Sequence, residues 1–394
     1  MHGASLGPHL NASERALALD LHKVILADIN WGRSRTPATT EKKALLSNRL
    51  ESKWIECFER VFALCKIARG DAIAILSETQ SRQINVQLAE LALHRIGARP
   101  FHLVVPTPQL ETSIPIRSTG ASNAVQRLGP VIHALSSSVA VIDVTVEGML
   151  HSVELADILA KGTRLYMISD EHPEVLERLM PNPALRPKVE AGAAMMRNAR
   201  EMRVLSDAGT DLVVDMLDAA RIGGNWGFSD APGSVSHWPG GLCAGYPRAG
   251  AVNGTVVMDA GDVNLTFKRY IERPITLRLE NDFIVSIEGK GTDAELMRAY
   301  YAAWNDKNAY ASAHLGWGMN PDARWEALTM YDRSDVNGTE LRVFAGNFLF
   351  STGANKYANR FTLGHFDLPM RNCTVQLDGK TVVDKGRLVP ELMI

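Results

Sequence analysis

Short apolar runs alternate with amphipathic stretches along residues 71–179 of this chain. Four continuous apolar runs predict buried strands, at 71–77, 99–106, 139–146 and 164–169. Apolar residues at steps of three and four positions predict helices between and after them, at 83–97, 123–135, 153–159 and 173–179. Continuous apolar strands that alternate with such helices are typical of a parallel sheet covered on both faces.

The pattern changes on either side of this region. Residues 1–40 are polar and weakly patterned apart from one expected helix at 14–28, and a further helix is expected over 41–66. After about residue 205, glycine-rich and β-type segments replace the alternation. These segments predict two hairpins and one helix, at 275–287, 374–383 and 293–305.

We therefore expect three parts in the chain. Residues 1–40 form an N-terminal arm, 41–205 an α/β, Rossmann-like domain with a mostly parallel sheet, and 206–394 an α+β domain. No glycine-rich nucleotide motif follows the strand at 71–77, and no GxxxxGK(S/T) pattern occurs in the sequence. The first domain is therefore expected to act as a scaffold rather than as a nucleotide site.

Composition excludes several classes of partner. The chain has 394 residues with 42 Lys and Arg against 44 Asp and Glu, and this balance argues against nucleic acid as a partner. No apolar run reaches the ~18 to 20 residues that span a bilayer, and we expect a cytoplasmic protein without a membrane partner. The four cysteines form no CxxC pair and are expected to be reduced thiols, at Cys57, Cys65, Cys243 and Cys373.

Histidines and one carboxylate supply the candidate chemistry. In an extended segment, His365 and Asp367 project from the same face and can meet one metal ion. His314 stands 51 positions before His365. Two histidines and one carboxylate leave the opposite face of a metal open to substrate and O₂, as in non-haem Fe(II) oxygenases. The same pattern also fits a structural role, in which His314 ends a strand and His365 is a core histidine bonded to Asp367.

Three segments carry a family resemblance. AHLGWGMNP, GNFLFSTGANKY and GHFDLPMRNCTVQLDGK resemble the C-terminal stretches of 2,5-dihydroxypyridine 5,6-dioxygenases, which are ring-cleaving Fe(II) enzymes of nicotinate breakdown. The likeness covers most of the second domain and, more loosely, the α/β domain. It implies Fe(II) held by His314, His365 and Asp367, with a small aromatic N-heterocyclic substrate and O₂ as partners. The expected product is N-formylmaleamate, and the relatives with this architecture imply a homo-oligomer.

That family shares its fold with metal-dependent aminopeptidases of the thermophilic type, so the resemblance implies an aminopeptidase-like second domain. This chain departs from the peptidase pattern at two positions. Leu242 stands where those peptidases carry a metal-binding glutamate in a PxGE context, and His314 stands where they carry another glutamate. The loss of two carboxylates favours a single Fe(II) over a two-metal hydrolytic centre. A metal aminopeptidase and a non-catalytic protein on that scaffold stay open as alternatives.

Two further histidines are candidates for proton transfer or substrate orientation, because a free imidazole titrates near neutral pH. His237 precedes the glycine-rich loop and is the first candidate. His151 follows the strand at 139–146, and loops after parallel strands are where open α/β sheets place ligands. Structural roles are the alternatives, with His237 bonding to the backbone of a loop and His151 beginning a helix.

Overall fold

The computed structural model describes residues 49–109, 112, 120–168 and 170–394. The predicted arm at 1–40 and its helix at 14–28 lie outside these residues. The chain divides into two compact units, Met1–Leu50 and Glu51–Ile394, and the described helices and strands all belong to the second. None of the described helices is long and apolar enough to cross a membrane.

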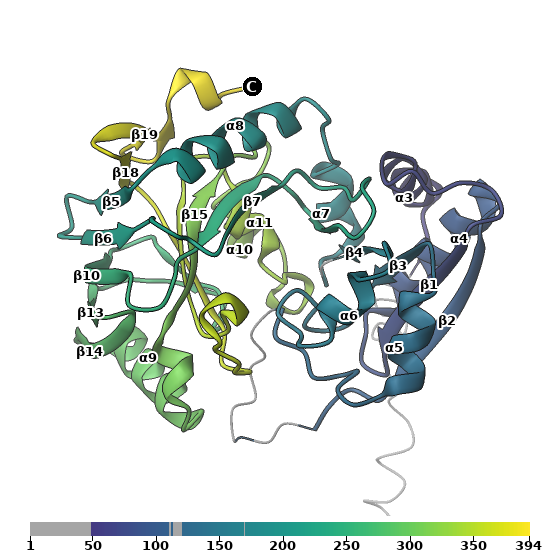
Figure 1. Cartoon of the computed structure of the whole chain (residues 1–394), viewed down its shortest axis with the longest axis horizontal. Helices are drawn as coiled ribbons and strands as arrows, with labels where there is room; N and C mark the ends of the chain where they lie inside the picture. The colour runs from purple at the N-terminus through teal and green to yellow at the C-terminus, as the bar shows by residue number, and fades with distance from the viewer. Residues whose placement is uncertain (1–48, 110–111, 113–119, 169) are drawn as a thin grey trace, which may run out of the picture. The chain divides into compact units, whose positions relative to one another are not determined.

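A parallel sheet is formed mainly by the first part of this unit (Figure 1). Its strand order is β2-β1-β3-β4-β8, and every neighbouring pair is parallel. The strands are β1 (Ala72–Glu78), β2 (Arg99–Val105), β3 (Ala140–Asp143), β4 (Arg164–Ile168) and β8 (Val235–Trp238). The first four lie at the predicted apolar runs, and β1, β3 and β4 are buried as predicted. The prediction of a buried strand is wrong for β2, which lies at the edge of the sheet and is mostly exposed. The fifth, β8, comes from beyond the boundary expected near residue 205, and the division into domains stays a prediction.

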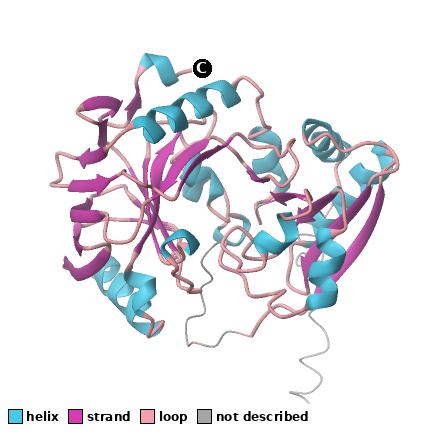
Figure 2. Ribbon diagram, in the orientation of Figure 1, coloured by secondary structure: helices cyan, strands magenta, loops and turns pink. Residues whose placement is uncertain are grey.

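Helices cover this sheet, as the alternating pattern predicts (Figure 2). They are α3 (Ser52–Leu64), α4 (Gln83–Ile96), α5 (Gly129–Ser136), α6 (Leu155–Leu159) and α7 (Pro173–Arg178). Leu135 of α5 and Ile158 of α6 pack with Val141 and Leu165 of the sheet in one buried apolar cluster. The helix expected over 41–66 is described from Ser52 onward.

Antiparallel sheets make up the second half of the unit. Among the described residues, one has eight strands in the order β14-β13-β10-β6-β5-β18-β19-β20, one has five in the order β17-β16-β15-β9-β7, and β11-β12 is a small pair. Their bounds are β5 (Glu201–Leu205), β6 (Asp211–Asp215), β7 (Arg221–Asn225), β9 (Leu242–Tyr246), β10 (Val252–Met258), β11 (Val263–Asn264), β12 (Arg269–Tyr270), β13 (Ile275–Glu280), β14 (Phe283–Gly289), β15 (Ser312–Gly318), β16 (Phe348–Thr352), β17 (Phe366–Met370), β18 (Thr374–Leu377), β19 (Lys380–Asp384) and β20 (Arg387–Leu388).

Both hairpins lie where the sequence predicts them, as β13–β14 and β18–β19. In the second, Asp378 and Gly379 have φ of 48° and 76°, and a type I′ turn requires positive φ at both central positions. The chain therefore combines a parallel sheet with antiparallel sheets, in agreement with the expected α/β and α+β elements.

The remaining described helices follow α7 along the chain. They are α8 (Leu185–Asn198), α9 (Thr292–Ala303), α10 (Ala327–Met330), α11 (Thr339–Val343), and the 3₁₀ turns η1 (Lys307–Tyr310), η2 (Arg333–Asp335), η3 (Lys356–Ala358) and η4 (Pro390–Leu392). Met196 of α8 packs with Trp317, Phe348 and Phe366 in a large apolar cluster that also takes in the eight-stranded sheet. This cluster packs against the five-stranded sheet, whose strands β15, β16 and β17 carry the candidate site.

Candidate active site

Three neighbouring strands of the five-stranded sheet bring polar side chains together. His314 lies on β15, Ser351 on β16 and Asp367 on β17, and Ser351 is paired directly with Asp367. The register between β15 and β16 shifts between Ser312 and Leu315, which places His314 at a bulge. Bulges re-aim side chains and are frequent beside active sites.

Ser351 joins His314 and Asp367 through two hydrogen bonds. Its hydroxyl donates to Oδ1 of Asp367 and lies 3.1 Å from Nδ1 of His314. Because the hydroxyl hydrogen is directed to the carboxylate, Nδ1 of His314 is the donor in the second bond, and its Nε2 is left as a lone-pair ligand. Nε2 of His314 lies 3.7 Å from Oδ1 of Asp367, and burial lowers the pKa of His314 to about 3 despite that carboxylate.

His365, which is fully buried just before β17, completes the predicted triad. Its Nε2 lies 3.2 Å from Oδ1 of Asp367, but neither ring nitrogen forms a hydrogen bond within the described part of the chain. A buried imidazole without hydrogen bonds is costly unless another ligand uses its nitrogen. Ring nitrogens of His151, His314 and His365 all lie within 4.8 Å of one another.

This donor set fits a divalent metal ion. Ligands bound at about 2.1 Å to one ion lie roughly 3 to 4 Å apart, and the distances of 3.2 and 3.7 Å from Asp367 to the two histidines fall in that range. The lone pair on His314, the unbonded nitrogens of His365 and one carboxylate are donors suited to Fe(II). His151 is near enough to be a further ligand.

Arg342 holds the far oxygen of this carboxylate. It lies on α11, and its Nε donates to Oδ2 of Asp367 at 2.6 Å. Burial by itself raises the pKa of Asp367, but the neighbouring His365 ring and the Arg342 guanidinium outweigh it and hold the pKa well below its usual value. Asp367 is therefore an anion that leaves Oδ1 directed toward the histidines.

His237 lies on β8 rather than in the loop suggested as its structural alternative. Its Nδ1 lies 2.7 Å from the carbonyl oxygen of Pro239, so Nδ1 carries the hydrogen and Nε2 is a proton acceptor. Burial lowers the pKa of His237 to about 4, although the bond to Pro239 opposes the shift. The ring is therefore neutral near pH 7.

His151 lies in the loop between β3 and α6, and it does not begin a helix. Asp143 shapes this loop, because its carboxylate accepts hydrogen bonds from the backbone of Thr145 and of Met149. Gly120 adopts φ of 82° and packs against the imidazole, where an added Cβ would lie 2.8 Å from Cδ2 of His151. Burial and the neighbouring histidines hold the pKa of His151 well below its usual value.

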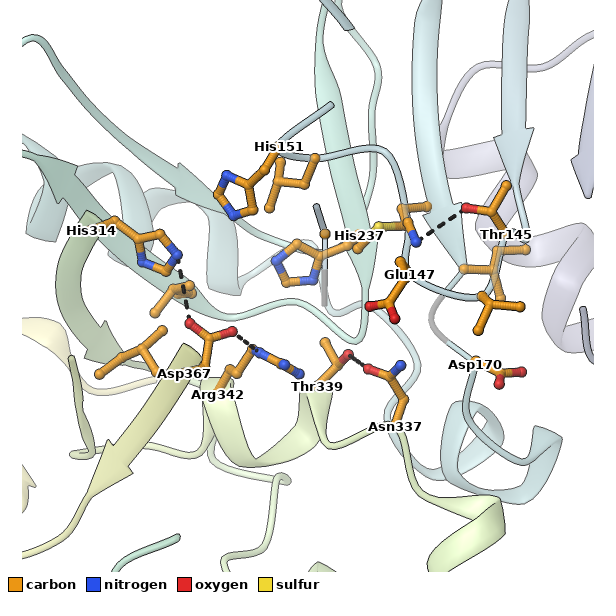
Figure 3. Close-up of a pocket in the computed structure, with 18 residues that line it drawn as sticks. Thr145, Glu147, His151, Asp170, His237, His314, Asn337, Thr339, Arg342 and Asp367 are labelled. Atoms are coloured by element: carbon orange, nitrogen blue, oxygen red, sulfur yellow. Dashed lines mark hydrogen bonds and ion pairs between the residues drawn. The ribbon is translucent and has the colours of Figure 1, made fainter. Parts of the chain in front are cut away.

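A small cavity of about 50 Å³ opens beside these groups (Figure 3). The side chains of His151, His237 and His314 point toward a common region next to Asp367. Leu242 also lines the cavity, as do residues at its far end, Glu147, Asp170, Asn337 and Thr339. The structure thus brings all five predicted site residues together, with His365 fully buried beside Asp367 and not among the residues that line the cavity.

Sequence reasoning missed two residues of the site. Ser351 lies in the segment GNFLFSTGANKY, where a polar residue inside an apolar run was the available signal. Arg342 lies 25 positions before Asp367, and no local pattern links them.

Comparison with known proteins decides the family. A model of the 2,5-dihydroxypyridine 5,6-dioxygenase family matches residues 53–390. The chain belongs to this family. Within the dioxygenase family, the 2,5-dihydroxypyridine 5,6-dioxygenase of Pseudomonas putida KT2440 is 35% identical over 338 residues, which cover 85% of this chain and 95% of that protein.

Solved structures agree with the assignment to the dioxygenase family. The structure of 2,5-dihydroxypyridine dioxygenase from Pseudomonas putida KT2440 matches with a TM-score of 0.81 at 34% identity, covering 86% of this chain and 99% of that one. Wild-type AmpT from Thermus thermophilus matches with a TM-score of 0.59 at 15% identity over 86% and 99% of the two chains. The second match shows the fold alone, and it agrees with the shared fold expected from the sequence.

Proposed function

We propose that this protein opens the ring of 2,5-dihydroxypyridine, or of a close hydroxylated pyridine, with O₂. The observation that carries the proposal is the convergence of His314, His365 and Asp367 beside a small cavity, in a chain of the dioxygenase family. Cleavage between C5 and C6 turns C5 into a carboxyl carbon and C6 into a formyl carbon on nitrogen. The product, N-formylmaleamate, contains all atoms of the ring and of O₂, so the reaction needs no external reductant.

His314, His365 and Asp367 are the residues that would hold Fe(II). When bound, Fe(II) supplies the one-electron chemistry that allows O₂ to react with an aromatic ring. Asp367 balances part of the positive charge, and Ser351 and Arg342 fix its two oxygens. A 2-His-1-carboxylate arrangement of this kind is the expected donor set of a non-haem extradiol-type dioxygenase.

The other histidines act on the substrate. Nε2 of His237 accepts the proton of the 5-hydroxyl, because Nδ1 is already committed to Pro239. His151 faces the same cavity and orients the ring or receives the second proton. Leu242 provides an apolar wall that excludes water from the reacting region.

Leu242 also argues against the hydrolytic alternative. It lines the cavity at the position where the related peptidases are expected to carry a metal-binding glutamate. A two-metal centre needs bridging carboxylates, and leucine cannot serve as a ligand.

The test is metal analysis coupled to oxygen uptake. We expect about one Fe per chain and consumption of one O₂ for each 2,5-dihydroxypyridine opened. Asp367→Ala should abolish both iron binding and turnover, and full iron occupancy in that variant would contradict the ligand assignment. Release of amino acids from peptides under anaerobic conditions with zinc or cobalt would instead support an aminopeptidase. Complete absence of bound metal would support a non-catalytic protein.

A cytoplasmic location and a homo-oligomeric assembly also belong to this proposal. The nearly neutral charge balance suits a small aromatic substrate and O₂, which need no strong field of either sign. Size-exclusion chromatography with light scattering tests the expected oligomer.

A further inference from the structure

A second and larger cavity adjoins the histidine cluster. Its volume is about 130 Å³, against about 50 Å³ for the cavity beside Asp367. His151, His237 and Leu242 line both cavities, so the two proposed proton-transfer residues are accessible from each of them.

The two cavities differ in charge. Arg221, Lys356 and Arg360 line the larger one, and none of its lining residues in the described chain is an aspartate or a glutamate. Arg360 is buried and bonded to Asp282 at 2.7 Å, so its charge is compensated. The smaller cavity contains carboxylates, among them Asp367.

Arg221 and Lys356 therefore supply the positive charge of the larger cavity. Arg221 donates to the hydroxyl of Tyr357 at 3.0 Å, and the ammonium of Lys356 lies 5.4 Å from the centre of the Tyr357 ring. Within the described residues, neither cation forms an ion pair with a carboxylate. Both charges remain available to an anion that enters the cavity.

Aromatic rings connect these cations to the candidate metal ligands. The ring of Tyr246 lies 5.3 Å from that of His314 and 5.2 Å from that of Tyr357, measured between ring centres. Tyr246 also lines the larger cavity. The larger cavity is thus bordered by the histidines His151 and His237 as well as by Arg221 and Lys356.

Ring opening changes the charge of the bound molecule. The dihydroxypyridine ring is uncharged at neutral pH, whereas cleavage at C5 creates a carboxylic acid that loses its proton to solvent or to a base. We propose that the cavity lined by Arg221, Lys356 and Tyr357 binds the carboxylate of the ring-opened product. This inference rests on the proposed function and adds a product site to it.

The test measures equilibrium binding to the purified, metal-containing protein by isothermal titration calorimetry. The probes are maleamate, which is the product without its N-formyl group, and maleamide, its uncharged diamide. We expect maleamate to bind about tenfold more tightly than maleamide. A carboxylate can also bind a metal, so the comparison of the two ligands does not by itself locate the site. The decisive measurement therefore uses the double variant Arg221→Gln with Lys356→Gln. This variant should weaken maleamate binding about five- to tenfold and leave maleamide unchanged.

Two control variants separate the site from general charge effects. Lys356→Arg should keep the affinity for maleamate, because the positive charge is retained. Lys380→Gln removes an exposed lysine on β19 that does not line the cavity, so this variant should also keep the affinity for maleamate. Added salt should weaken maleamate binding in the wild type more than in the double variant.

Equal binding of maleamate and maleamide, or unchanged maleamate binding in the double variant, would overturn the inference. Tighter binding of 6-hydroxypyridine-3-carboxylate than of maleamate would also overturn it, because the site would then recognise a ring acid. If the protein consumes O₂ with 2,5-dihydroxypyridine but fails these binding tests, the product site is wrong and the proposed function stands. If the protein prefers maleamate to maleamide but consumes no O₂, the proposed function is wrong. The carboxylate bound in the cavity is then not that of a ring-opened product.

Discussion

Arg342 and Asp367 form a buried ion pair, with Nε and Oδ2 separated by 2.6 Å and the side chains only 10% and 4% exposed. Two opposite charges removed from water stabilise each other only while both are present. The pair also leaves Oδ1 of Asp367 for Ser351 and the histidines, so it sets the orientation of the one carboxylate in the proposed ligand set.

Arg342→Met should lower the free energy of unfolding of the metal-free protein by about 3 kcal/mol, because Asp367 then keeps a buried charge without this partner. The loss should be smaller in the iron-loaded protein, where a cation compensates the carboxylate. Urea unfolding of both forms measures the difference. Arg203→Met is the matched control, since the pair between Arg203 and Asp211 is exposed and should contribute little. Equal losses in the two arginine variants would contradict the prediction.

Ser351→Ala should reduce iron affinity or turnover about 10- to 100-fold with little change in the fold. The substitution removes the hydroxyl that fixes both His314 and Asp367. Ser312→Ala is a close control, because Ser312 is buried on the same strand as His314 but its hydroxyl has no hydrogen-bond partner in the described chain. Iron titration under anaerobic conditions compares the variants, and equal affinities would remove Ser351 from the site.

His237→Ala and His151→Ala should retain iron but lose about 10²- to 10⁴-fold in rate, as expected for general acid and base residues. Elemental analysis and oxygen uptake on the same samples test this. His133→Ala, on the exposed face of α5, serves as the control. Loss of iron from the His151 variant alone would instead place His151 among the ligands, together with His314 and His365.

The contribution of Asp262 to the free energy of unfolding should decrease as the pH rises. Burial raises the pKa of its carboxyl to about 7. The backbone N–H groups of Arg371 and Asp259 donate to this carboxylate and oppose the rise, because they favour its charged form. The folded state therefore holds a proton that the unfolded state releases near pH 4, and this contribution is complete below pH 4 and lost as the pH rises through 7.

Between pH 5 and pH 8 the loss from this group is on the order of 2 kcal/mol. Asp262→Asn cannot titrate, so the difference in unfolding free energy between wild type and variant should shift by that amount over the same range. Urea unfolding at the two pH values measures the shift. A constant difference would show that Asp262 has an ordinary pKa in the folded protein.

The elements that the sequence predicts well are those whose pattern is local. Strands β1, β3 and β4 are largely apolar, buried runs, and the turn at Asp378-Gly379 carries its own backbone preference. Strand β2 was placed correctly, but its exposure follows from its position at the sheet edge, which the run of residues does not encode. Strand β8 was missed because its four residues, Val235–Trp238, are too few and too mixed to form an apolar run. Helix α8 was missed because Pro187 and Gly192 interrupt its pattern, although its packing on β7 and β9 stabilises it.

The residues of the candidate site also differ in whether a local pattern could reveal them. The histidines and Asp367 were found through residue type and a family resemblance, both of which can be read from the chain. Ser351 and Arg342 act through contacts across strands and from a separate helix, at separations of 16 and 25 positions from Asp367. Such contacts depend on strand register, which no local pattern encodes here.

The return of the chain to the parallel sheet at β8 has a consequence for protein engineering. A fragment cut near residue 205 would lack β8, so β4 would become an open edge with unpaired backbone groups. The same cut would separate His237 from the loop that carries His151. Complementation from two separately expressed halves would therefore require β8 of one half to pair with β4 of the other.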